Sequence, residues 1–185
     1  MKLSKVKKVV LNHGSLCVAK AETGLDVRTW VGCDMAMYPV HELYMTPALA
    51  ARIWELTGKQ VNALRITEEI DSDRPLLIMP EDLERLPMLA EAESEAPNLY
   101  ELCRIDGNVI LVDRDTGRAR YFREDLLGPT EGRIVYFGES RDNIIGAYSN
   151  GVLEAAIYTG RWEANDILTK KIEKLAEVWG NREQR

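Results

Sequence analysis

The sequence is short of the residues that form disulfides and bind transition metals. Its 185 residues include three Cys and two His, and an odd number of Cys cannot all pair within one chain. Residues 1–8 carry four Lys with no long apolar segment behind them, which argues against a secretory signal. We therefore expect reduced thiols and a cytoplasmic protein.

Long apolar runs and an excess of positive charge are also missing. No run approaches the roughly 20 apolar residues that cross a bilayer, so we expect no contact with a membrane. The net charge is −6, which disfavours general binding to nucleic acid because such binding needs cations that displace phosphate counterions. Residues 68–95 hold ten acids and two Arg. This stretch is either a solvated linker or a docking surface for a basic partner.

The sequence has no motif that holds phosphate or a cofactor. It lacks G-x-x-x-x-G-K-[ST], G-x-G-x-x-G after a strand, and G-x-S-x-G, which mark nucleotide-binding loops and hydrolase nucleophiles. Carboxylate pairs such as Glu124 and Asp125 are frequent, but acid–base catalysis needs two carboxylates held in one cleft. We expect no cofactor.

The thiols and imidazoles of the first half are the next candidates for chemistry. His13, Cys17, Cys33 and His41 follow the spacing H-x3-C-x15-C-x7-H. Zinc binds these residue types, but zinc knuckles use short C-x2-4-C pairs, which are absent here, so we expect no metal. A Cys33–His41 pair, in which the imidazole activates an exposed thiol, is one enzymatic alternative.

Glycine turns between β-branched runs predict a fold built on hairpins. The stretch from Cys103 to Leu126 has a turn at Asp106-Gly107, an apolar run, a second turn ending at Gly117 and a returning strand, which is typical of an antiparallel hairpin. We expect strands at residues 6–11, 16–21, 27–31, 35–40, 76–79, 100–105, 109–112, 118–122, 133–137, 144–148 and 152–158.

Helical periodicity appears in two places and a helical turn in a third. Thr46-Pro47 is a helix start, and residues 46–57 should cover the first sheet. Pro80 opens a helical turn, and residues 166–179 form a closing helix over the second sheet. The sequence thus predicts an α+β fold of antiparallel β-hairpin-based sheets with about three helices. Acidic residues 91–97 suggest two subdomains, 1–96 and 97–185; a single mixed domain is the alternative.

An internal repeat is a further hypothesis. Gly14–Val18 aligns with Gly107–Leu111, and Tyr38 aligns with Tyr121 after a ten-residue excess in the first copy. If residues 12–43 and 105–126 are one duplicated hairpin, the two tyrosines should occupy equivalent places. The alternative is that hairpins share turn residues without common origin.

Two surfaces are candidates for binding. Arg118, Arg120 and Arg123 could form an anion-binding face with the neighbouring aromatic residues, or they could be solvated and paired across strands. Apolar residues of the closing helix recur with helical spacing and form a stripe that either docks on the second half or makes a dimer contact. The partner-binding residues of this stripe are Ile172, Leu175 and Trp179.

The absence of a catalytic constellation favours a non-catalytic interaction or adaptor module of the cytoplasm, with a protein partner and with a homodimer as an option. A nucleic-acid accessory protein that uses the arginines of the second half is one alternative. A small-molecule enzyme with a carboxylate or Cys/His site is the other.

Overall fold

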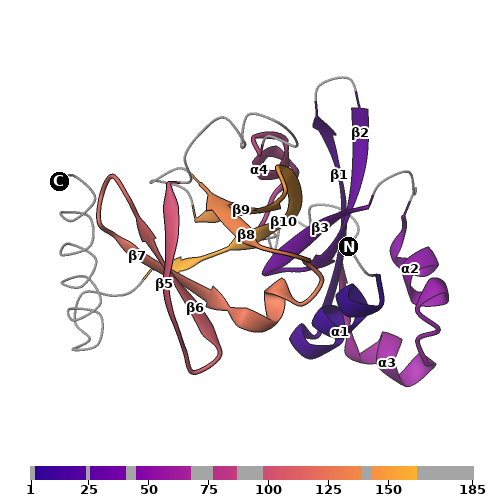
Figure 1. Cartoon of the computed structure of the whole chain (residues 1–185). Helices are drawn as coiled ribbons and strands as arrows, with labels where there is room; N and C mark the ends of the chain where they lie inside the picture. The colour runs from indigo at the N-terminus through magenta and orange to yellow at the C-terminus, as the bar shows by residue number, and fades with distance from the viewer. Residues whose placement is uncertain are drawn as a thin grey trace.

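The computed structural model confirms the α+β class and places the strands in one large sheet (Figure 1). It describes residues 3–23, 26–40, 45–67, 77–86, 98–138 and 143–161, and for residues 22, 23, 26, 27 and 161 the backbone alone. Within these ranges there are 11 strands in a single sheet and four α-helices. The prediction of separate hairpin-based sheets with about three helices therefore underestimated the size of the sheet and the number of helices.

The helices are α1 (Leu3–His13), α2 (Pro47–Ile53), α3 (Gly58–Ala63) and α4 (Pro80–Glu84), with a 3-10 turn η1 (Glu124–Leu127). The strands are β1 (Ser15–Thr23), β2 (Asp26–Cys33), β3 (Ala36–Val40), β4 (Arg65–Thr67), β5 (Leu99–Ile105), β6 (Asn108–Asp113), β7 (Ala119–Arg123), β8 (Ile134–Phe137), β9 (Ile144–Ser149), β10 (Val152–Tyr158) and β11 (Gly160–Arg161).

The strand order is β11-β7-β6-β5-β8-β9-β10-β3-β2-β1-β4. Consecutive strands pair antiparallel within β1-β2-β3, β5-β6-β7 and β8-β9-β10, as hairpin turns require. Only Thr159 separates β10 from β11, and β11 pairs with β7. Since β10 pairs with β9 and the almost continuous β11 pairs with β7, strands β5 to β11 form a ring that the chain closes at Thr159. Strand β3 joins this ring to the N-terminal strands by pairing with β10.

The predicted first strand is wrong, because residues 3–13 form helix α1. Val6, Val9 and Val10 are spaced as one helical face, and all three are buried. Gly14 ends the helix with a φ of +66°, and its N–H donates to the carbonyl oxygen of Val10. The β-branched valines had suggested a strand, but burial against the sheet overrides that propensity.

The helix start at Thr46-Pro47 is confirmed: the Thr46 side chain accepts a hydrogen bond from the Leu49 N–H at 3.2 Å. The helix is shorter than predicted, since α2 ends at Ile53. Gly58 begins the next helix, α3, where Thr57 and Gln60 form a capping box.

The short α4 confirms the predicted turn at Pro80, whereas the described part of the predicted strand 76–79 is not a strand. The predicted closing helix 166–179 lies outside the described residues.

Two apolar cores lie on opposite faces of the sheet. The larger one joins α1, α2, η1 and the inner face of the ring, and it includes Val9, Trp54 and Tyr38. There the Tyr38 hydroxyl donates to the backbone oxygen of Leu126 at 2.6 Å. The smaller core lies under α4, where Leu83 packs on the same side of the sheet as Trp30.

The internal repeat is unconfirmed. Residues 15–40 form three strands, whereas the second copy contributes only β6 and β7. Tyr38 is fully buried in the larger core, and Tyr121 belongs to a third, small cluster on β5, β6 and β7. The subdomain boundary near residue 97 stays a prediction. No helix among the described residues is long and apolar enough to cross a membrane.

Candidate interaction surface

The structure separates the three arginines of the predicted anion-binding face. Arg118 and Arg123 are exposed, but Arg120 lies opposite Leu111 on the inner face of the ring and is only 3% exposed. Its Nη2 lies 3.8 Å from Oδ2 of Asp113, which is 1% exposed. Arg120 is therefore part of a buried ion pair, and its guanidinium does not reach the surface with its two neighbours.

The thiol and imidazole side chains are not assembled into a site within the described residues. No group of three or more His, Cys, Asp or Glu there could hold a metal ion, and His41 lies outside the described ranges. His13 Nε2 lies 3.3 Å from Oδ2 of Asp125, where α1 meets η1. Cys33 is buried, not exposed on a turn.

Burial suppresses the reactivity of two of the three free thiols. It raises the pKa of Cys17 to about 12 and that of Cys33 to about 11, and the thiolate is the reactive form. Cys103 is partly exposed.

We therefore expect one thiol, that of Cys103, to react with a disulfide reagent at pH 8 in the folded protein, and three to react in denaturant. The rapid reaction should vanish in Cys103→Ser. Rapid modification of either remaining thiol in that variant would contradict the burial of Cys17 and Cys33.

The partner-binding residues of the closing helix, Ile172, Leu175 and Trp179, lie outside the described residues.

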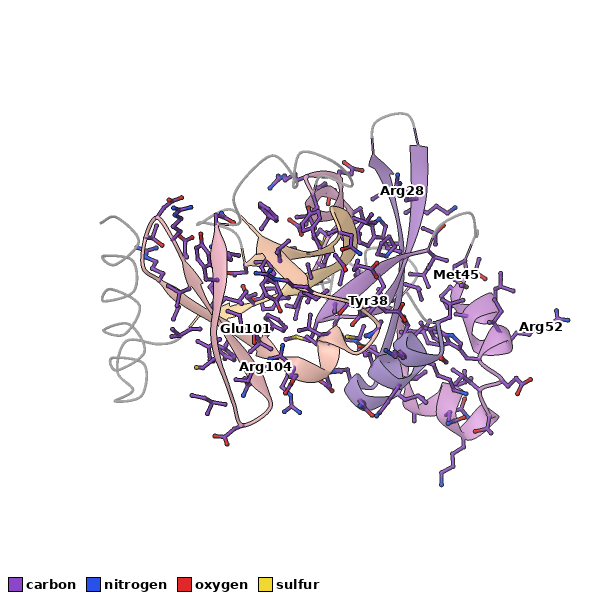
Figure 2. All side chains as sticks on the ribbon, in the orientation of Figure 1. Arg28, Tyr38, Met45, Arg52, Glu101 and Arg104 are labelled. Atoms are coloured by element: carbon purple, nitrogen blue, oxygen red, sulfur yellow. The ribbon has the colours of Figure 1, made fainter. Side chains whose placement is uncertain are left out.

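Two exposed ion-pair networks are satisfied internally. Arg104 donates to both carboxylate oxygens of Glu101 and to Glu124, and Tyr136 donates to Glu101 at 3.3 Å. The bidentate contact holds the Arg104 and Glu101 side chains together (Figure 2). These contacts hold β5 to η1 and β8. The Arg104 guanidinium binds the carboxylates of both Glu101 and Glu124.

The second network is centred on Asp34, which lies in the turn between β2 and β3 and contacts β1 and β4. Its carboxylate accepts a hydrogen bond from the Ser15 hydroxyl at 2.9 Å and one from Arg65 Nη2 at 2.6 Å. The Asp34 N–H donates back to the Ser15 hydroxyl oxygen. This contact fixes the short strand β4 at the end of the sheet.

The clearest local excess of charge is in a cationic layer, which we define as α1, α2, α3 and β4 together with the residues that connect α2 to β4. These residues, 3–13 and 47–67, contain six Lys or Arg and one Glu, an excess of five positive charges in a chain of net charge −6. The cations are Lys5, Lys7, Lys8, Arg52, Lys59 and Arg65.

Packing brings α1, α2 and α3 to one side of the molecule (Figure 1). Lys7 in α1 donates through Nζ to the backbone oxygen of Trp54, directly after α2. Trp54 and Leu64 pack in or against the larger core beside the valines of α1. The cations of α1 and α2 thus belong to one layer on the face of the sheet that holds the larger core, and Arg65 lies at the edge of that sheet on its opposite face.

Four cations of this layer are exposed and have no ion pair among the described residues: Lys5 and Lys8 in α1, Arg52 in α2 and Lys59 in α3. Figure 2 shows Arg52 pointing away from the ribbon. Two large apolar side chains accompany them, Ile53 and Ile66, each 43% exposed. A surface that combines free cations with exposed apolar groups fits an acidic, partly apolar partner.

Sequence reasoning missed this layer because it compared the acidic residues 68–95 with all the rest of the chain, whose charges nearly cancel. A charge count restricted to residues 3–13 and 47–67 was the first requirement for finding it. The identification of α1 as a helix was the second requirement, since it places Val6, Val9 and Val10 inward and leaves Lys5 and Lys8 exposed.

Comparison with known proteins adds no relative: the sequence matches no protein-family model, and neither a curated protein nor a solved structure matches it.

Proposed function

We propose that this chain is a non-catalytic interaction module of the cytoplasm that docks an acidic segment of a partner protein on the cationic layer. The excess of five positive charges over residues 3–13 and 47–67 carries the proposal. Because the chain as a whole is acidic, this positive charge is confined to one part of it. We expect it to attract an anionic partner at that side of the molecule.

The state of the other polar groups supports a binding role. Arg120 faces Asp113 in the interior, and Glu101, Arg104 and Glu124 bind one another. These groups stabilise the fold through their mutual contacts. The cations Lys5, Lys8, Arg52 and Lys59 are available to a ligand without the loss of an ion pair among the described residues.

A protein segment is favoured over nucleic acid for two reasons. The net charge of −6 disfavours binding to a phosphate backbone. Exposed Ile53 and Ile66 lie within the same layer, and apolar side chains match an amphipathic peptide better than they match sugar and phosphate.

The test uses the whole chain and a capped nine-residue peptide that alternates Glu and Val. Reversal of three exposed cations, Lys5→Glu, Arg52→Glu and Lys59→Glu together, should weaken binding about tenfold or more, because attraction becomes repulsion. Binding to the unmodified chain should also weaken as salt rises. Fluorescence anisotropy of a labelled peptide measures both effects.

The matched control reverses three exposed arginines of the second half, Arg114→Glu, Arg118→Glu and Arg133→Glu. This control should bind the peptide within about twofold of the unmodified chain if docking is local. A peptide that alternates Lys and Val should not bind. The proposal is overturned if the acidic peptide does not bind or if both triple variants lose affinity equally. Tighter binding of a DNA duplex than of the acidic peptide would overturn it as well.

A further inference from the structure

Among the described residues, β4 is the last strand at one edge of the sheet, and no strand pairs with it on the side away from β1. The two strands run parallel with Ser15 opposite Arg65 and Leu16 opposite Ile66, and the Arg65 N–H donates to the Gly14 carbonyl at 2.9 Å. Successive peptide groups of a strand point to opposite sides. The N–H and C=O of Ile66 therefore point away from β1, toward the edge of the sheet.

The side chains at this edge alternate in chemistry as well as in direction. Ile66 lies on the same face of the sheet as its neighbour Leu16, a residue of the larger core, yet it is 43% exposed. Arg65 lies on the opposite face, where it reaches Asp34 and keeps 48% of its side chain exposed. An added strand would meet an apolar group on one face and a guanidinium on the other.

We propose, as an extension of the function proposed above, that the acidic partner segment binds as an additional strand on β4. Its backbone pairs with the N–H and C=O of Ile66. Its side chains alternate between apolar residues, which cover Ile66, and acidic residues, which lie on the face of Arg65. Strand addition obtains affinity from main-chain hydrogen bonds and specificity from alternate side chains, and both requirements are met at this edge.

A second copy of the chain is a weaker occupant. An antiparallel pair of β4 strands centred on Ile66 would involve three residues from each copy. It would also bring two cationic layers together, each with an excess of five positive charges, and like charges across an interface oppose association. An acidic strand has the opposite sign, so charge complementarity selects it.

The test removes the outward N–H without touching the bonds to β1. Proline is tolerated on an edge strand where the N–H faces solvent, so Ile66→Pro should fold, and circular dichroism of the full chain checks this. The control Ile66→Ala loses the side chain and keeps the N–H. With the Glu–Val peptide as probe, Ile66→Pro should bind about tenfold more weakly than Ile66→Ala, because a main-chain hydrogen bond and its geometry are lost.

A second measurement remains informative if Ile66→Pro does not fold. The same peptide with N-methyl groups on every second amide keeps its side chains and cannot pair along one edge. It should lose binding to the unmodified chain in one of its two methylation registers and retain it in the other. Equal binding of Ile66→Pro and Ile66→Ala, or equal binding of both methylated peptides and the parent, would overturn strand addition. The proposed function would still stand if the Lys5, Arg52 and Lys59 reversal weakened binding.

Discussion

Replacement of Arg120 by Met should lower the free energy of unfolding by about 3 kcal/mol. Arg120 and Asp113 are 3% and 1% exposed, and they face each other on the inner side of the ring. Asp113 also accepts hydrogen bonds from the N–H groups of Asp115 and Thr116 at 3.0 and 2.9 Å. Arg120→Met keeps the apolar stem of the side chain and removes the guanidinium, so the Asp113 carboxylate stays in the interior without that countercharge.

Urea denaturation measures the effect, and Arg118→Met is the matched control. Arg118 is exposed, so its replacement should change stability by no more than about 0.5 kcal/mol. Adding Asp113→Asn to Arg120→Met removes the buried negative charge and should recover part of the loss. A loss below about 1 kcal/mol for Arg120→Met would mean that the ion pair contributes little to the fold.

Replacement of Gly32 by Ala should destabilise the protein by about 3 kcal/mol or more. A methyl group at Gly32 would overlap the carbonyl oxygen of Ala36 and lie 3.0 Å from the Cα of Met37. These atoms belong to the backbone of β3, which pairs with β2 at this point. A strand between two neighbours cannot move aside without loss of its ladder hydrogen bonds, so the strain cannot be relieved by a side-chain rotation.

Gly58→Ala is the matched control for this substitution. Gly58 is the first residue of α3, and nothing lies within 4 Å of the position that its Cβ would take. Since Ala favours the helix over Gly, this variant should be as stable as the parent or more stable by up to about 1 kcal/mol. The thermal midpoints of the two variants should move in opposite directions or differ widely. Equal midpoints would contradict the close approach of β2 and β3.

The hairpins were predictable because their signals are local. Turns at Asp106-Gly107 and Asn150-Gly151 have positive φ at both residues, as two-residue hairpin turns require, and β6, β7, β9 and β10 follow as predicted. The first helix was not predictable, because Val6, Val9 and Val10 have β-branched side chains and only the sheet beneath them makes helical burial favourable. The joining of β3 to β10 depends on contacts between residues about 120 positions apart, which no local pattern encodes.

The candidate surface was predictable only in part. The cations can be read from the sequence. Their proximity, however, depends on the helical structure of α1 and on its contact with Trp54. Arg120 illustrates the opposite case. Its spacing from Arg118 suggested a shared surface, and the closing of β5 to β11 into a ring turned it inward toward Asp113. Ring closure is a property of the whole topology.

Amide hydrogen exchange of the full chain, with and without the Glu–Val peptide, tests the central claim most directly. If an acidic strand docks on the cationic layer at β4, protection should increase at the amide of Ile66 and at its neighbours in α3 and β4. The amides of β6 and β7 should exchange as in the free protein. Protection centred on β6, β7 and the exposed Arg118, with none at Ile66, would contradict the claim.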